Sequence, residues 1–277
     1  MSLPHHLQIG GTAAPAAAGA AAASRHAPDS GSELTCHSRA SADLRQDPHG
    51  SNSLRPVVAA AAASGANPEG GTPDEKTSAP LRNVGLVVWQ AAFVLAEYLS
   101  RVQPLGLWRG QRVVELGAGT GVAGISLARR GAHVVSTDLP HVTPLLRLNA
   151  EANVLGPGAG HGAIEVVDHA WGSGDTASVL APLPGQECDV LIGADVTYEE
   201  DVIPLLLKSI RALCSPHTVL YLAYKKRGLG EGRVGALLEE QGFHVSTVAA
   251  EFLHPEYQEA GVYTILRGIQ LDGMETD

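Results

Sequence analysis

The stretch Arg112-Val-Val-Glu-Leu-Gly-Ala-Gly-Thr-Gly-Val-Ala-Gly124 decides the fold. Its first residues, Arg112 to Leu116, predict a buried strand, and the glycines that follow predict a tight turn. The apolar, alanine-rich run from Val122 to Arg130 then predicts a helix. Glycine lets backbone approach a ligand where a Cβ would collide, and a helix start offers unpaired N–H groups. The stretch therefore predicts a cradle for a nucleotide-type cofactor.

Composition excludes several classes of protein. The formal net charge of −10 over 277 residues argues against a nucleic-acid binder, which usually carries a basic face. No apolar run approaches 18 residues without charge, so no membrane span is expected. The three cysteines are too widely spaced for a zinc site or a disulfide framework. We therefore expect no metal and a reducing, cytoplasmic location.

The chain divides into two parts near residue 78. Residues 1–78 contain alanine-rich low-complexity runs without helical or strand periodicity, and they predict a disordered extension. The first 28 residues contain no Asp or Glu, which leaves organelle targeting open as an alternative, although Arg25 is their one Arg or Lys. Residues 79–277 predict one folded domain.

Strand and helix patterns alternate through this domain. The residues from Val84 to Leu99 predict an extended piece that turns into a helix. The strands are expected at 112–116, 133–137, 163–167, 189–193, 218–223, 243–249 and 262–267, and the helices at about 122–130, 140–153, 202–213 and 233–241.

Such alternation implies a parallel sheet with helices on both faces, and a ligand site outside the carboxyl ends of its strands. No helical pattern separates the last two strands, so we expect them to pair as a hairpin. The predicted fold class is therefore α/β: a Rossmann-like seven-stranded sheet, mostly parallel, with an antiparallel C-terminal strand.

Two cofactors compete for the glycine turn. Gly119 to Gly124 fits the dinucleotide pattern G-x-G-x-x-G, and Asp138 follows at the spacing which that pattern requires, so a nicotinamide-dependent oxidoreductase is one hypothesis. Glu115 lies just before the glycines, where it would repel a pyrophosphate and favour a cofactor with a cationic group. Glu115 therefore argues against a nicotinamide cofactor.

At these residues the chain resembles the seven-β-strand S-adenosylmethionine-dependent methyltransferases. Further stretches resemble the family-16 protein-lysine methyltransferases, and within them the valosin-containing-protein lysine methyltransferase branch. These stretches are Gly85-Leu-Val-Val-Trp-Gln-Ala-Ala92, Ala170-Trp-Gly172, Ala194-Asp-Val-Thr-Tyr198 and His254-Pro-Glu-Tyr257. The resemblance covers the chain from about Val84 to its end.

The resemblance implies a role for ten residues. It implies that Asp138 binds the ribose hydroxyls, that Trp89 closes over the cofactor, and that Trp171 packs beside the adenine. Asp195 and Tyr198 match the D-x-x-Y signature that flanks the channel for the substrate lysine, and are the expected catalytic residues. The expected cofactor-binding residues are Trp89, Glu115, Gly117, Ala118, Gly119, Asp138, Trp171 and Ala194.

The chemistry agrees with these roles. Methyl transfer needs mainly positioning, and a lysine must also lose a proton because its reference pKa is about 10.4. Asp195 could hold the incoming ammonium and Tyr198 could orient the amine; no dedicated base is evident. Lys225-Lys226-Arg227 predicts a solvated loop, with a patch for an acidic partner as the alternative. Asp168 and His169, neighbours in an extended segment, should point to opposite sides, which argues against a catalytic pair.

The chain departs from the family at two places. The β-hairpin that members have before the Trp89 motif has no counterpart pattern in residues 50–80, and Gln90 replaces a common Asp. The expected function is protein-lysine N-methylation by a monomer that acts on a protein substrate, with a chaperone-like or ATPase protein as one candidate. A methyltransferase for histidine or a small molecule, the oxidoreductase, and a non-catalytic interaction protein remain the alternatives.

Overall fold

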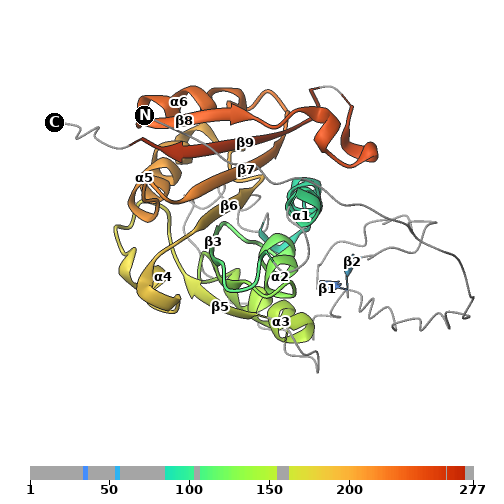
Figure 1. The fold of residues 1–277 in the computed structure, drawn as a ribbon, viewed down its shortest axis with the longest axis vertical. Helices are drawn as coiled ribbons and strands as arrows, with labels where there is room; N and C mark the ends of the chain where they lie inside the picture. Colours follow the sequence, from blue (N-terminus) through green and yellow to red (C-terminus); the bar gives the residue numbers. More distant parts are fainter. Residues whose placement is uncertain are drawn as a thin grey trace, which may run out of the picture. The chain divides into compact units, whose positions relative to one another are not determined.

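The computed structural model describes residues 34–36, 54–56, 85–102, 107–154, 162–259 and 261–271. These residues form a seven-stranded sheet with the strand order β5-β4-β3-β6-β7-β9-β8 (Figure 1). Its strands are β3 Arg112–Leu116, β4 His133–Asp138, β5 Ala163–Asp168, β6 Val190–Ala194, β7 Val219–Lys225, β8 Phe243–Thr247 and β9 Tyr263–Gln270. The α-helices are α1 Gln90–Val102, α2 Val122–Ala128, α3 Thr143–Val154, α4 Ala177–Leu180, α5 Ile203–Leu213 and α6 Val234–Glu240.

The strands pair as the sequence predicts. β3 lies between β4 and β6, and the five strands β3 to β7 are parallel to one another. β9 inserts between β7 and β8 and is antiparallel to both. The predicted fold class is therefore confirmed, including the C-terminal hairpin of β8 and β9.

Helices cover both faces of the sheet, and each face has its own core. Val113 and Ile192 pack with residues of α1 and α2 on one face. Their neighbours Val114 and Leu191 pack with residues of α4, α5 and α6 on the other face. Figure 1 shows α1 and α2 on one side of the sheet and α4 and α5 on the opposite side. Burial on both faces explains why these strands are continuous apolar runs rather than alternating ones.

Two helices differ from the prediction. α3 begins at Thr143 rather than near Pro140. After β4 the chain first makes a tight turn in which the Val142 N–H donates to the Leu139 carbonyl at 2.8 Å, and Pro144 rather than Pro140 lies in the first turn of the helix. α4 was not predicted, because four residues are too few to show a period.

Residues 1–78 contain one described feature. β1 Leu34–Cys36 and β2 Leu54–Pro56 form a parallel pair of three-residue strands. The predicted disordered extension, the alternative of organelle targeting and the predicted absence of a hairpin in residues 50–80 otherwise fall outside the described residues. Within the part of the chain that the structure describes, no helix is both long and apolar enough to cross a bilayer.

Candidate functional site at the carboxyl ends of β3, β4 and β6

The glycine turn after β3 has a backbone that other residues would strain. Gly117, Gly119 and Gly121 have φ angles of +63°, +55° and +85°. A Cβ on Gly119 would lie 3.1 Å from the Gly85 carbonyl oxygen. A Cβ on Gly117 would lie 2.8 Å from the Trp171 ring. The turn therefore packs against both tryptophan motifs, and only glycine leaves its Cα surface open.

Asp138 holds the turn from the neighbouring strand. Its Oδ2 accepts the Gly119 N–H at 2.7 Å, and its Oδ1 accepts the Leu139 N–H at 2.7 Å. Each carboxylate oxygen keeps further acceptor capacity. Burial raises the pKa of Asp138, while these two backbone N–H groups lower it in part. The structure thus places Asp138 beside the glycine turn, as the sequence predicts.

Ala118 and Ala194 belong to the same strand ends. The Ala118 N–H donates to the Thr137 carbonyl at 2.9 Å, and its own carbonyl accepts the Gly121 N–H at 2.8 Å. Ala194 is the last residue of β6, half-buried and in register with Ala223 of β7. Both alanines flank the turn, and their expected contact with a cofactor stays a prediction.

Glu115 is buried beneath the turn. Ser136 donates its hydroxyl to Glu115 Oε2 at 2.6 Å, and the backbone N–H of Gly124 also binds the carboxylate. The side chain is only 2% exposed. Burial raises the pKa of Glu115 to about 7, against the lowering effect of Ser136 and Gly124. The carboxyl group joins β3 to β4 and α2, which the sequence did not indicate; its contact with a cofactor stays a prediction.

Asp195 is buried and already carries an ion pair. Its backbone has a φ of +55°, rare outside glycine. Arg227 binds the carboxylate with both terminal nitrogens, Nη1 to Oδ1 at 2.9 Å and Nη2 to Oδ2 at 3.0 Å. The Lys225 backbone N–H donates to Oδ1 at 3.1 Å. Arg227, expected in a solvated loop, is therefore part of the candidate site.

The Arg227 guanidinium also contacts Trp89. Its Cζ lies 5.2 Å from the centre of the Trp89 ring, a distance typical of a cation–π contact. The Trp89 ring is 40% exposed. The structure thus brings together two predicted residues, Trp89 and Asp195, through one that the prediction missed. The strand register could have indicated this contact, because Ala194 pairs with Ala223 and Arg227 lies four residues after Ala223.

Tyr198 and Tyr263 complete the aromatic surroundings. Burial raises the pKa of Tyr198, and the charges of Glu199 and Asp138 add to the rise. Tyr263 donates its hydroxyl to Gln90 Oε1. Burial raises the pKa of Tyr263, and the charge of Asp195 adds to it. Asp195 and Tyr198 follow β6, which pairs in parallel with β3, so they lie at the same edge of the sheet as the glycine turn.

A buried carboxylate holds the loop that presents Arg227. The Glu231 side chain accepts the backbone N–H groups of Arg227, Gly228 (2.7 Å) and Leu229 (2.7 Å). Burial would raise the pKa of Glu231, but these and other backbone N–H groups outweigh it and lower the pKa. These hydrogen bonds hold the backbone of the loop that carries the Arg227 side chain.

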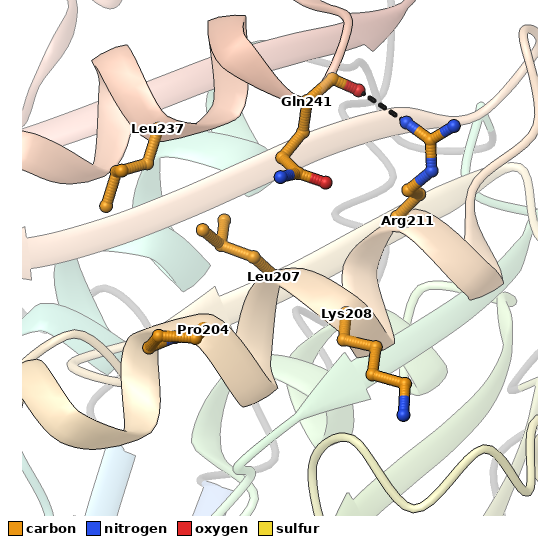
Figure 2. Close-up of a pocket in the computed structure, with 6 residues that line it drawn as sticks. All are labelled: Pro204, Leu207, Lys208, Arg211, Leu237 and Gln241. Carbon is orange, nitrogen blue, oxygen red and sulfur yellow. Dashed lines mark hydrogen bonds between the residues drawn. The ribbon is translucent and has the colours of Figure 1, made fainter. Parts of the chain in front are cut away.

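Two other features make none of the side-chain contacts described above. His169 is buried and bonds to Ser209 at 3.1 Å, while Asp168 accepts the Thr143 hydroxyl at 2.6 Å, so the neighbours face opposite ways as expected. A groove of about 330 Å³ lies between α5 and α6. Figure 2 shows its lining residues, among which Arg211 donates to the Gln241 carbonyl. None of the predicted site residues lines this groove. Among the described residues, no cluster of three or more His, Cys, Asp or Glu side chains could bind a metal.

Residues 75–241 match a family model described as "Lysine methyltransferase". The chain is 37% identical over 147 residues to EEF1A lysine methyltransferase 3 of Xenopus tropicalis, a match that covers 52% of this chain and 60% of that protein. It is 41% identical over 140 residues to the Mus musculus protein of the same name, covering 50% and 55%. It is 41% identical over 165 residues to protein N-lysine methyltransferase METTL21A of Mus musculus, covering 60% and 71%. The chain thus spans less than two thirds of the first two relatives.

Proposed function

We propose, because the chain belongs to the lysine methyltransferase family, that it is an S-adenosylmethionine-dependent protein-lysine N-methyltransferase. The observation that carries the proposal is that the glycine turn, Asp138 and the Asp195–Tyr198 motif lie at the carboxyl ends of the adjacent parallel strands β3, β4 and β6. Family membership argues against the nicotinamide hypothesis, although the glycine spacing alone fits both cofactors. The valosin-containing-protein branch remains a prediction, since the relatives above carry other names.

The residues around the turn fit such a cofactor. When bound, S-adenosylmethionine supplies a methyl group activated by a sulfonium. Gly119 leaves open the space that a Cβ would fill, and Asp138 keeps acceptor capacity for the ribose hydroxyls. Trp171 packs its ring against Gly117 and offers a flat wall for an adenine. Trp89 precedes the turn in sequence, whereas Trp171 follows it. The Trp89 ring is partly exposed and would cover the bound cofactor.

The substrate lysine would approach beside the D-x-x-Y motif. Tyr198 can orient an amine by a hydrogen bond or by a cation–π contact. Asp195 Oδ2 accepts one hydrogen bond from Arg227 and keeps a second lone pair for an N–H of the lysine. These residues bind and orient the nucleophile, which agrees with a reaction that depends mainly on positioning.

The protein substrate is the least constrained part of the proposal. Two relatives are named for EEF1A, so we propose EEF1A as the first substrate to test, with the chaperone-like and ATPase proteins expected from the sequence as the next set. We expect a monomeric, cytoplasmic enzyme, which size-exclusion chromatography and cell fractionation would test.

One experiment tests both halves of the proposal. The full chain is titrated calorimetrically with S-adenosylhomocysteine and with NADH, and then incubated with labelled S-adenosylmethionine and either EEF1A or a cell extract. We expect binding of S-adenosylhomocysteine alone, and methylated lysines in the mass map. Binding of NADH alone would contradict the cofactor. Methyl groups only on histidine or small molecules would contradict the lysine, and no incorporation with intact binding would favour a non-catalytic protein.

A further inference from the structure

The negative charge of Asp195 is matched before any substrate enters. Its side chain is 4% exposed, and it forms a bidentate ion pair with the guanidinium of Arg227. A carboxylate paired in this way offers an incoming ammonium little net attraction, because the guanidinium repels what the carboxylate attracts. The sequence-based role of Asp195, to hold a lysine ammonium, therefore needs revision.

Arg227 is held in place on three sides. Asp195 binds its guanidinium, the Trp89 ring lies 5.2 Å from its Cζ, and Glu231 binds the backbone N–H of Arg227 itself. A residue fixed by such a set of contacts keeps its charge at one point rather than moving aside into solvent. Its side chain is 27% exposed, so the solvent screens this charge only in part.

Two of the other acids near the pair already have partners: Asp138 accepts the Gly119 and Leu139 N–H groups, and Glu231 accepts N–H groups of its own loop. Lys225 adds a second positive charge, with its Nζ 5.9 Å from the centre of the Tyr263 ring. The titratable or charged groups of this region come from four strands and the loops that follow or precede them. They are Asp138 at the end of β4; Asp195, Tyr198 and Glu199 after β6; Lys225 at the end of β7, with Arg227 and Glu231 in the loop after it; and Glu259 before β9, with Tyr263 on it.

We propose that Arg227 is a positioning residue that keeps the substrate lysine in its neutral, nucleophilic amine form. The inference rests on the proposed function, since it concerns the same channel. A lysine ammonium that enters beside this pair loses hydration without gaining a free counter-charge, because Arg227 already neutralises Asp195, so it releases its proton to bulk water. The remaining lone pair of Asp195 Oδ2 then accepts an N–H of the amine. This accounts for the absence of an evident general base.

The test uses n-butylamine as the probe, because it reproduces the end of a lysine side chain without needing the protein substrate. It is titrated into the full chain, loaded with S-adenosylhomocysteine, at pH values from 7 to 10.5. The indole N–H resonance of Trp89 reports binding. We expect affinity to rise with pH, with a midpoint below the lysine reference pKa of about 10.4.

Three variants separate the role of the charge from that of the fold. R227Q should raise the midpoint by roughly one pH unit, and R227K, which keeps the charge, should restore most of it. D195N should lower the midpoint, because it leaves the guanidinium unmatched. R233Q is the matched control, since the Arg233 side chain is 72% exposed and pairs 3.7 Å from Glu200; it should change nothing.

The outcomes distinguish the inference from the proposed function. An unchanged midpoint in R227Q and D195N, with S-adenosylhomocysteine binding intact, would overturn the role of Arg227. Tighter binding of the ammonium than of the amine in wild-type protein, or no amine binding at pH 10.5, would do the same. If R227Q fails to fold, the opposite shift in D195N still decides. If wild-type protein shows the expected pH dependence of n-butylamine binding but methylates no lysine, the proposed function alone would be contradicted.

Discussion

At Gly119, backbone from two parts of the chain and a carboxylate meet within contact distance. We expect Gly119→Ala to weaken S-adenosylhomocysteine binding about tenfold or more, because a Cβ would enter the cradle 3.1 Å from the Gly85 carbonyl oxygen. Isothermal titration measures the loss. Gly110→Ala is the control: its φ of +78° gives similar backbone strain, but no atom lies within 4 Å of its Cβ position. Equal losses in both variants would contradict the assignment.

Glu115 makes folding stability depend on pH. Its folded pKa of about 7 exceeds the ordinary value of 4.5, so between these values the folded chain holds a proton that the unfolded chain has released. The free energy of unfolding should therefore fall as pH rises through this window, by up to about 3 kcal/mol, and level off above pH 7. Glu115→Gln removes this titration.

Urea denaturation of wild-type protein and Glu115→Gln at pH 5 and pH 8 measures the effect. The stability of the variant relative to wild type should improve at pH 8. Glu239→Gln, at an exposed position in α6, is the control and should give the same difference at both pH values. A constant difference for Glu115→Gln would show that the carboxyl group is ionised throughout.

Single residues mark the limit of what the sequence could predict. The identities of Gly119, Asp138 and Asp195 follow from motifs, and the structure places them at the carboxyl ends of the adjacent strands β3, β4 and β6. The direction of a side chain does not follow from a motif. Glu115 turns beneath α2 because Ser136 and the Gly124 N–H satisfy its carboxylate there. Arg227 turns inward because Asp195 and Trp89 receive it. Both outcomes depend on partners that are distant in sequence.

At the scale of elements, α2 depends on close contact with the sheet. Gly124→Ala should destabilise the protein by about 2 kcal/mol, because a Cβ would lie 2.3 Å from Glu115 Oε2 and 2.5 Å from Ser136 Oγ. Gly235→Ala in α6 is the matched control, since its nearest neighbours would be 3.8 and 3.9 Å away. We expect the control to be neutral or stabilising by about 0.5 kcal/mol. Thermal unfolding of both variants checks this, and similar melting temperatures would contradict it.

Elements were predicted best where burial leaves a continuous signal. β3 was predicted with the bounds that the structure shows, because its apolar run ends at a glycine. β9 was predicted to end at Arg267, before Gly268, but the strand continues through that glycine to Gln270. α3 was predicted to begin too early, because Pro140 is compatible with a first helical turn in sequence but here belongs to the turn after Asp138. Pro204, by contrast, does lie at the start of α5. The local sequence alone does not distinguish these two prolines.

At the scale of the whole molecule, the seven-stranded sheet is complete within residues 112–270. We therefore expect a chain that lacks residues 1–78 to keep its fold, its melting temperature and its affinity for S-adenosylhomocysteine. Circular dichroism and calorimetry of the shortened chain against the full chain provide the test. A fall in melting temperature of more than about 5 °C, equivalent to roughly 1–2 kcal/mol, would show that the extension stabilises the domain.

The position of β9 has a consequence for how the chain is made. Among the described strands, β8 hydrogen-bonds to the sheet through β9 alone, and β9 comes after all the others in sequence. During synthesis β8 leaves the ribosome before β9 has been made. Until then the edges of β7 and β8 that pair with β9 remain without a partner strand. Completing this sheet thus requires the insertion of a late strand between two earlier ones. A nascent chain stalled before Tyr263 leaves those edges open to association with other chains.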